Sequence, residues 1–256
     1  MPGLIGKRTV GVGLKMYLDH PSTLRWLEGV RDIIGEHPAV VSREVGVYVL
    51  PGFTSLVEAA AIFEGSPISF GAQDLAWADA GPYTGEVSGV DLAQIGCTFV
   101  EVGHAERRRH FLEDGDVFSY KLDAAYRNGL VPVLCVGEET RGSASDAADV
   151  VVGQLDEALR VSMETGSTGP MVLAYEPVWA IGAPKPAPTD FIREVADAAR
   201  SAIDARPVLA GSRLIYGGGA SSGLLPSLGG SVDGLFLGRS SHDISVLRDV
   251  IDEAAT

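Results

Sequence analysis

Residues 171–182 read Met-Val-Leu-Ala-Tyr-Glu-Pro-Val-Trp-Ala-Ile-Gly. The first four form an apolar run typical of a buried strand, so Glu176 lies at the carboxyl end of that strand, where parallel sheets carry their functional groups. Pro177 and Gly182 enclose a short, partly apolar loop that can act as a lid and exclude water. A carboxylate beneath such a lid is well placed to move a proton next to a carbonyl group. The alternative interpretation is a glutamate that only caps the following helix.

A histidine occupies a similar position after the apolar run at residues 98–102. The chain continues Gly-His-Ala-Glu-Arg-Arg from Gly103, so His104 lies at a strand end and at the start of a helix. The positive end of the helix dipole disfavours a charged imidazolium there. A neutral imidazole can still donate a hydrogen bond that polarises a carbonyl group, and we predict this role for His104.

Glycines end several of the other predicted strands. Residues 11–15 read Gly-Val-Gly-Leu-Lys, and residues 215–219 read Ile-Tyr-Gly-Gly-Gly. The last strand ends in Leu-Gly-Arg at residues 237–239. Turns without side chains let backbone N–H groups approach a phosphate closely, so these segments predict an anion site.

Apolar runs and amphipathic stretches alternate eight times along the chain. Amphipathic stretches such as 22–35, 144–164 and 190–205 separate the apolar runs. This alternation predicts an α/β protein with parallel strands and crossover helices, and 256 residues suffice for one (β/α)₈ barrel. We see no linker and no internal repeat, so we expect a single domain over residues 1–256. The predicted strands lie near residues 9–13, 46–50, 68–73, 98–102, 131–136, 171–176, 213–217 and 233–237.

Composition limits the possible partners. The formal net charge of −14 argues against nucleic acid and anionic membranes as partners. An anionic substrate remains possible because Lys15 and Arg239 would act locally. The two cysteines, Cys97 and Cys135, lie in apolar stretches and are predicted to pack in the core, and no spacing indicates a disulfide framework, a metal site or a cofactor site. No secretory signal or long apolar segment is evident, so we expect a cytoplasmic protein.

These motifs, in this order and at these spacings, resemble the triosephosphate isomerase family over nearly the full length of the chain. The resemblance implies a TIM barrel that isomerises a phosphorylated ketose or aldose by proton transfer through an enediolate. It implies that Glu176 is the base, His104 the electrophile and Lys15 the electrostatic lysine. Glu106 matches a supporting carboxylate.

The same resemblance implies a substrate-binding set and a homodimer. A long loop after the third strand contains Thr84 and Glu86, which match the loop that reaches into the neighbouring subunit of the family's dimers. An aromatic residue on such a loop, here Trp77, more often marks an interface than a cofactor site. The residues that match positions around the substrate and its phosphate are Gly13, Gly182, Gly218, Gly219, Gly238 and Arg239.

Several departures from the family pattern concern the lid. Family members have serine where this chain has Gly219, and commonly have glycine where it has Pro184. In the family that serine bonds a backbone N–H near the end of the lid. Gly219 has no hydroxyl and Pro184 has no N–H, so both halves of this contact are missing. We expect the lid to close more weakly or to latch elsewhere, with Tyr216 as the candidate.

Three further departures concern the pocket. Ala105 replaces a serine, Arg239 replaces a glycine, and Gly13 replaces an asparagine beside the carbonyl end of the substrate. The small residue and the Gly-Arg-Ser sequence at 238–240 resemble the L-erythrulose-1-phosphate isomerase branch, whose substrate carries one extra hydroxymethyl group. That branch implies conversion of L-erythrulose 1-phosphate to D-erythrulose 4-phosphate. Two alternatives stay open: an ordinary triosephosphate isomerase, and a phosphosugar-binding homologue with little turnover.

Overall fold

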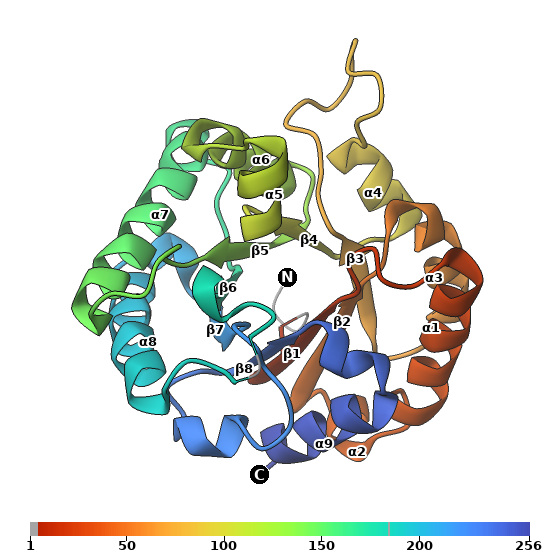
Figure 1. Cartoon of the computed structure of the whole chain (residues 1–256). Helices are drawn as coiled ribbons and strands as arrows, with labels where there is room; N and C mark the ends of the chain where they lie inside the picture. The colour runs from red at the N-terminus through yellow and green to blue at the C-terminus, as the bar shows by residue number, and fades with distance from the viewer. Residues whose placement is uncertain (1–4, 184) are drawn as a thin grey trace.

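The computed structural model describes residues 5–183 and 185–256, so Pro184 lies outside the described residues. Eight parallel strands form a closed barrel in which each strand pairs with its sequence neighbours and β8 pairs with β1. Figure 1 looks down the barrel and shows the helices in a ring around it. This is the (β/α)₈ TIM barrel that the alternating sequence pattern predicted. The strands are β1 (Arg8–Gly13), β2 (Val45–Leu50), β3 (Ser69–Ala72), β4 (Phe99–Val102), β5 (Val131–Val136), β6 (Val172–Tyr175), β7 (Arg213–Tyr216) and β8 (Gly234–Leu237).

Each predicted strand overlaps an observed one, and the boundaries differ by a few residues at most. The three predicted helices correspond to α1, α7 and α8, and capping side chains explain where two of them begin. Asp19 accepts the backbone N–H of Ser22 at α1, and Ser143 accepts that of Asp146 at α7. The helices are α1 (His20–Ile34), α2 (Pro38–Val41), α3 (Leu56–Ile62), α4 (Gly89–Ile95), α5 (Ala105–Phe111), α6 (Gly115–Arg127), α7 (Ala144–Thr165), α8 (Thr189–Asp204) and α9 (Ile244–Ala254).

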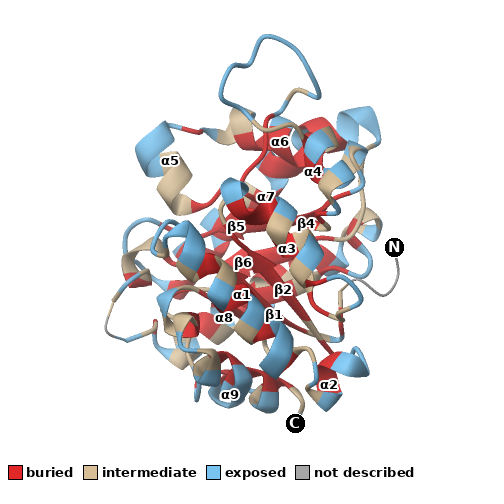
Figure 2. Cartoon of the chain, turned by 90° about the vertical axis from the view of Figure 1, so that its right-hand side faces the viewer, coloured by how far each residue is buried: buried red, intermediate tan, exposed pale blue. Residues whose placement is uncertain are grey.

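Two layers of core position the site. One layer lies between the barrel and its helices, and the strands appear as the buried centre of the molecule in Figure 2. The other layer fills the barrel itself, where the ring of Tyr48 stacks on Phe99 with centroids 4.4 Å apart. A side chain at Gly11 would meet the Tyr48 ring, because its Cβ would lie 2.3 Å from the hydroxyl. Glycine at this position therefore lets the aromatic rings close the barrel interior.

Both cysteines are buried and free, as the apolar context of each predicted. Cys135 belongs to the core inside the barrel, and Cys97 belongs to the core outside it. None of the helices in the described part of the chain combines the length and the apolar character needed to cross a bilayer.

The loop between β3 and α4 projects away from the barrel, at the top of Figures 1 and 2. The backbone N–H of Ala76 bonds the carbonyl of Val87 at 2.8 Å and closes the base of this loop. Trp77 and Tyr83 remain 41% and 40% exposed, and their rings meet edge to face with centroids 5.8 Å apart. Thr84 and Glu86, the residues predicted to reach a second subunit, lie on this projecting segment.

Candidate active site

A pocket of about 500 Å³ opens at the carboxyl ends of the strands. The loops after β1, β4, β6, β7 and β8 all contribute to it, as expected for a barrel of this type. The structure therefore brings nearly all of the predicted site residues together, and it adds one that sequence reasoning missed, Glu101. Gly218 is not among the lining residues. The pocket is lined by Gly13, Lys15, Glu101, His104, Glu106, Glu176, Gly182, Gly219, Gly238 and Arg239, among others.

Lys15 supplies a positive charge at the pocket. Its Nζ donates a hydrogen bond to Oε1 of Glu106 at 2.7 Å, which spans α5 and the loop after β1. Burial alone would lower the pKa of the ammonium, but the hydrogen bond and the charges of Glu106, Glu176 and Glu101 raise it above its ordinary value. Lys15 also has a φ of 52°, an uncommon backbone conformation for a residue with a long side chain. Such strain is concentrated at functional sites.

His104 caps α5 and projects its ring into the pocket. The Nδ1 atom accepts the backbone N–H of Glu106 at 3.1 Å, which requires that this nitrogen carry no proton. The proton of the neutral ring therefore lies on Nε2. This nitrogen is 3.5 Å from Oε2 of Glu176 and 3.9 Å from Oε1 of Glu101. The predicted position of the histidine at a strand end and a helix start is confirmed.

Glu176 follows β6 directly and is buried, with 5% of its surface exposed. Its Oε2 has no hydrogen-bond partner among the described residues, so one oxygen of a buried carboxylate is free to take a proton. Gly217 makes room for this side chain, because a Cβ there would lie 2.4 Å from Oε1. The carboxylate is thus held beside the pocket by its neighbours and not by capping a helix.

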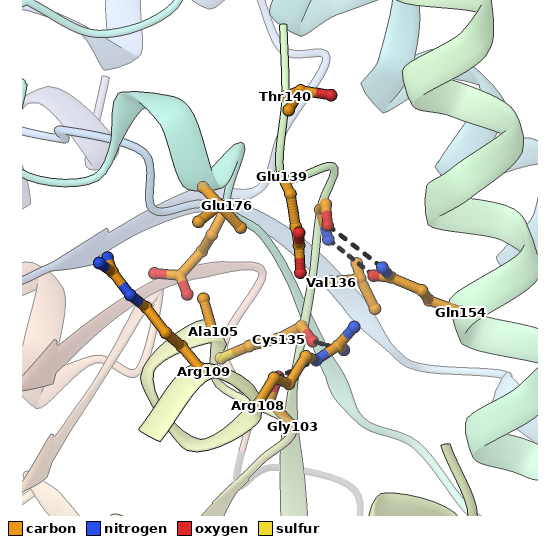
Figure 3. A pocket seen from close by; sticks show the side chains of 12 residues that line it. Gly103, Ala105, Arg108, Arg109, Cys135, Val136, Glu139, Thr140, Gln154 and Glu176 are labelled. Atoms are coloured by element: carbon orange, nitrogen blue, oxygen red, sulfur yellow. Dashed lines mark hydrogen bonds between the residues drawn. The ribbon is translucent and has the colours of Figure 1, made fainter. Parts of the chain in front are cut away.

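A second cavity of about 340 Å³ adjoins Glu176 on the side of β5. Figure 3 shows the carboxylate of Glu176 between Ala105 and the long side chain of Arg109. Arg108 lies farther back and donates to the carbonyls of Gly103 and Cys135 at 2.8 and 2.9 Å. Because Ala105 has no hydroxyl, its side chain offers Glu176 no hydrogen bond on this side.

The lid after Glu176 is anchored at both ends. At its beginning, the indole N–H of Trp179 donates to Oε1 of Glu138 at 2.7 Å. At its end, the hydroxyl of Tyr216 accepts the backbone N–H of Ala187 at 3.1 Å and donates to the carbonyl of Gly218 at 2.6 Å. Tyr216 was the candidate latch, and the structure has this contact. Glu138 was not recognised in the sequence, where it follows β5 without a motif that distinguishes it.

Crowding explains the glycine that replaces a serine in the seventh loop. Gly219 has a φ of 73°, and a Cβ there would lie 3.2 Å from the carbonyl oxygen of Ala180. A side chain would therefore strain the backbone and press on the lid. The other half of the missing family contact, Pro184, lies outside the described residues.

Arg239 begins the short helical turn after β8 (Arg239–His242). Its guanidinium lies over the ring of Tyr17, with 5.3 Å between its carbon and the ring centroid. One of its terminal nitrogens is 3.7 Å from the position of a Cβ on Gly182 in the lid. The positive charge therefore lies at the lid side of the pocket, where glycines of three loops converge.

Glu101 is the site residue that the sequence motifs did not reveal. It lies on β4, is 6% exposed and lines the pocket. Burial raises the pKa of its carboxyl to about 7, and nearby charges modify this effect. The signal in the sequence was a carboxylate two residues after Phe99 in an apolar strand, which gives both side chains the same inward direction.

A chain with this barrel and these strand-end residues belongs to the triosephosphate isomerase family. The family model for triosephosphate isomerase matches residues 8–254. The protein is an isomerase of this family. It is 48% identical over 250 residues to the L-erythrulose-1-phosphate isomerase of Pectobacterium atrosepticum, a match that covers 98% of this chain and 96% of that protein.

Two further relatives, one of each name, have similar sequence identity to this chain. The L-erythrulose-1-phosphate isomerase of Rhizobium etli is 37% identical over 251 residues, which covers 94% of this chain and 90% of the relative. The triosephosphate isomerase of Moorella thermoacetica is 40% identical over 222 residues, with 84% and 89% covered.

Proposed function

We propose that the protein converts L-erythrulose 1-phosphate to D-erythrulose 4-phosphate. The observation that carries this proposal is the position of Gly13, which lines the pocket without a side chain. Gly13 ends β1 with its missing side chain directed into the pocket, where the nearest atoms to a Cβ belong to Phe236 and Glu101. A side chain here would take up part of the pocket, which a four-carbon ketose phosphate needs for its extra hydroxymethyl group and a triose phosphate does not. The relative with 48% identity bears the name of the same activity.

In the proposed reaction, Glu176 removes the proton from C3 of the substrate, next to the C2 carbonyl. The buried position and the free Oε2 of Glu176 support this role. The electrons move onto the carbonyl oxygen, and an enediolate results. Return of the proton to C2 and transfer of a hydroxyl proton from the oxygen on C3 to that on C2 give the 4-phosphate. No atom is gained or lost.

His104 and Lys15 stabilise the negative charge of the enediolate in this mechanism. The Nε2–H of His104 donates to the developing oxyanion, as the corresponding neutral histidine of triosephosphate isomerase does. The ammonium of Lys15 supplies a full positive charge, and Glu106 orients it through the hydrogen bond at 2.7 Å.

The phosphate is proposed to bind at the lid side of the pocket. Backbone N–H groups of the glycine-rich turns can approach it closely, and the guanidinium of Arg239 can neutralise it. The carboxylates Glu101 and Glu176 would repel a phosphate, which favours the lid side for this group. Gly218 would contribute to this site through the shape of its turn. The candidate phosphate contacts are Gly182, Gly218, Gly219, Gly238 and Arg239.

We also propose that the enzyme is a cytoplasmic homodimer. The projecting loop with exposed Trp77 and Tyr83 supports a protein partner, since aromatic residues are enriched at interfaces. Thr84 and Glu86 would then enter the neighbouring subunit. Two free buried cysteines are compatible with a reducing compartment. Light scattering coupled to size exclusion tests the dimer, and a monomer at micromolar concentration would contradict it.

A side-by-side assay tests the proposed activity. The purified protein is given L-erythrulose 1-phosphate or dihydroxyacetone phosphate, and kcat/KM is measured for each. We expect at least a tenfold preference for the four-carbon substrate. Equal turnover or a preference for dihydroxyacetone phosphate would instead identify a triosephosphate isomerase. Failure to turn over either compound would indicate a phosphosugar-binding homologue.

A further inference from the structure

We infer that Glu101 is a specificity-determining residue that binds the terminal hydroxyl of a four-carbon ketose phosphate. This inference rests on the proposed function and assigns a partner to the extra hydroxymethyl group. It concerns a side chain outside the base, the electrophile, the lysine and the phosphate-binding turns.

Strand β4 directs the side chain of Glu101 into the barrel. Val100 and Val102 pack in the core outside the barrel, whereas Phe99 packs in the core inside it. Successive side chains of a strand alternate between its two faces, so Glu101 points inward with Phe99. It lies one layer nearer the carboxyl end of the strand than that ring. Glu101 is therefore the carboxylate that β4 contributes to the floor of the pocket.

Gly13 lies next to Glu101 at the pocket. A Cβ on Gly13 would lie 4.0 Å from Oε2 of Glu101 and 3.2 Å from Cζ of Phe236. The distance of 3.2 Å is shorter than an ordinary contact, so a side chain would crowd Phe236, and glycine leaves the pocket bordered here by an apolar ring and a carboxylate. A hydroxymethyl group has the same two parts. Its methylene fits against Phe236, and its hydroxyl comes within reach of Glu101.

The carboxylate of Glu101 has few hydrogen-bond donors around it. Its Oε1 receives only the weak donor of Cys135, with 3.6 Å between sulfur and oxygen, and Nε2 of His104 lies 3.9 Å away. For Oε2, no donor occurs among the residues that the structure describes, and this oxygen is not one of the fully buried unpaired atoms, so it faces the open pocket. A carboxyl group this buried normally has hydrogen-bond partners, because water no longer solvates it. A substrate hydroxyl would supply the missing donor.

The chemistry of Glu101 favours a hydroxyl over the other groups of the substrate. A phosphate is excluded because both groups are negative at the pH where the carboxyl is ionised, and because Arg239 lies at the lid side of the pocket instead. The reacting carbonyl has no proton to donate to a carboxylate. Of the two hydroxyl groups, the one on C3 takes part in the reaction, so the terminal hydroxyl on C4 is the group that can donate to Oε2 from the part of the pocket next to Gly13.

This contact gives a reason for rejecting the smaller substrate. Dihydroxyacetone phosphate lacks the fourth carbon, so Oε2 would lack the donor that the larger substrate supplies. A site built to hydrogen-bond a substrate hydroxyl rejects the analogue that lacks it, because the polar group of the site stays unpaired. We expect a discrimination of roughly ten- to hundredfold, the range for one hydrogen bond to a charged group.

The test compares three substrates with four proteins. The substrates are L-erythrulose 1-phosphate, its 4-deoxy analogue with a methyl in place of the hydroxymethyl group, and dihydroxyacetone phosphate. The proteins are the wild type, Glu101→Leu, Glu101→Gln and Asp74→Asn. Asp74 is the control because it is also a buried carboxyl with a raised pKa, but it pairs with Lys121 at 2.7 Å and does not line the pocket.

The ratio of kcat/KM between the natural substrate and the 4-deoxy analogue is the readout. We expect the wild type and Asp74→Asn to keep a ratio of roughly ten to a hundred, Glu101→Leu to bring it near one, and Glu101→Gln to give an intermediate value. The glutamine variant is nearly isosteric and keeps the test valid if the leucine variant does not fold. Melting temperatures report folding independently.

Three outcomes would overturn the inference and are distinguishable. If the wild type turns over L-erythrulose 1-phosphate but both Glu101 variants keep its ratio, the proposed function stands and the hydroxyl contact is wrong. The same conclusion follows if the variants lose all three substrates equally, since this would indicate that Glu101 acts on the reacting atoms. If the wild type does not turn over the four-carbon substrate, the proposed function fails and the inference fails with it.

Discussion

The hydroxyl of Tyr216 joins strand β7 to the end of the lid, where it accepts the backbone N–H of Ala187 at 3.1 Å. It also donates to the carbonyl of Gly218 at 2.6 Å, so one side chain fixes the seventh loop and the lid together. This arrangement needs neither a serine at position 219 nor an N–H at position 184. The lid of this enzyme thus has an anchor that survives both substitutions.

Tyr216→Phe is expected to lower kcat/KM roughly fivefold or more, because the N–H of Ala187 loses a bond worth about 1 kcal/mol. Steady-state kinetics on the preferred substrate checks this. Tyr126→Phe is the matched control, since its hydroxyl also bonds a carbonyl, that of Gly169 at 2.9 Å, but lies outside the pocket. An unchanged kcat/KM in Tyr216→Phe would show that closure does not depend on this bond.

Glu176→Gln is expected to lower kcat by at least two to four orders of magnitude, because an amide cannot accept the substrate proton. The variant should still bind glycerol 3-phosphate, a phosphorylated compound that cannot isomerise, and calorimetry measures this. Retention of more than about a tenth of the wild-type kcat would rule out Glu176 as the base.

Substitutions of the two charge-stabilising residues should have different kinetic effects. Lys15→Met should raise KM and lower kcat, because the ammonium attracts the substrate and also stabilises the enediolate. His104→Gln should act mainly on kcat, since its hydrogen bond strengthens as charge develops. Full kinetic curves for both variants separate the two constants. A His104→Gln enzyme with normal kcat and weaker binding would contradict the electrophile role.

Gly13→Asn should lower kcat/KM for L-erythrulose 1-phosphate by roughly ten- to several-hundred-fold, a cost of about 1–3 kcal/mol. The new side chain would press on Phe236 and fill the space next to Glu101. Turnover of dihydroxyacetone phosphate should fall less or increase. Gly13→Ala is the graded control, with only a Cβ in the pocket. Equal losses on both substrates would mean that Gly13 serves the backbone and not specificity.

Glu101→Gln should stabilise the protein at alkaline pH. Burial raises the pKa of this carboxyl from 4.5 to about 7, so the folded state binds its proton more tightly than the unfolded state does. Ionising the buried carboxyl therefore lowers the free energy of unfolding. This loss is absent below the unfolded pKa and grows as the pH rises through 7, to about 3 kcal/mol at about 1.4 kcal/mol per pKa unit. Urea unfolding from about pH 4.5 to about pH 8 should show the free energy of unfolding of the variant increasing relative to that of the wild type. A constant difference between the two proteins would contradict the raised pKa.

The sequence was sufficient for the barrel and for the positions of the reacting residues. Apolar runs that end in glycine or in a charged residue mark the strands, and Lys15, His104 and Glu176 follow these runs directly. Such signals are local, so they can be recognised without knowledge of tertiary contacts. The roles of these residues, the phosphate contacts and the dimer stay predictions.

Glu101 could not be recognised from the sequence because its importance depends on distant neighbours. Its partners in the pocket floor come from the first and last strands, and Phe236 follows Gly13 only after most of the chain. Which face of β4 points inward becomes clear only when the barrel has closed. Glu138 was missed for the same reason, because its contact with Trp179 links two loops that no motif connects.

The aromatic rings inside the barrel have a consequence for the order of events in turnover. Tyr48, Phe99 and Phe236 fill the barrel below the site, so the pocket is closed toward the interior of the barrel. Substrate and product therefore enter and leave at the carboxyl ends of the strands, where both cavities beside Glu176 lie. Because substrate and product would bind the same residues, accumulated product must compete with fresh substrate for the empty enzyme.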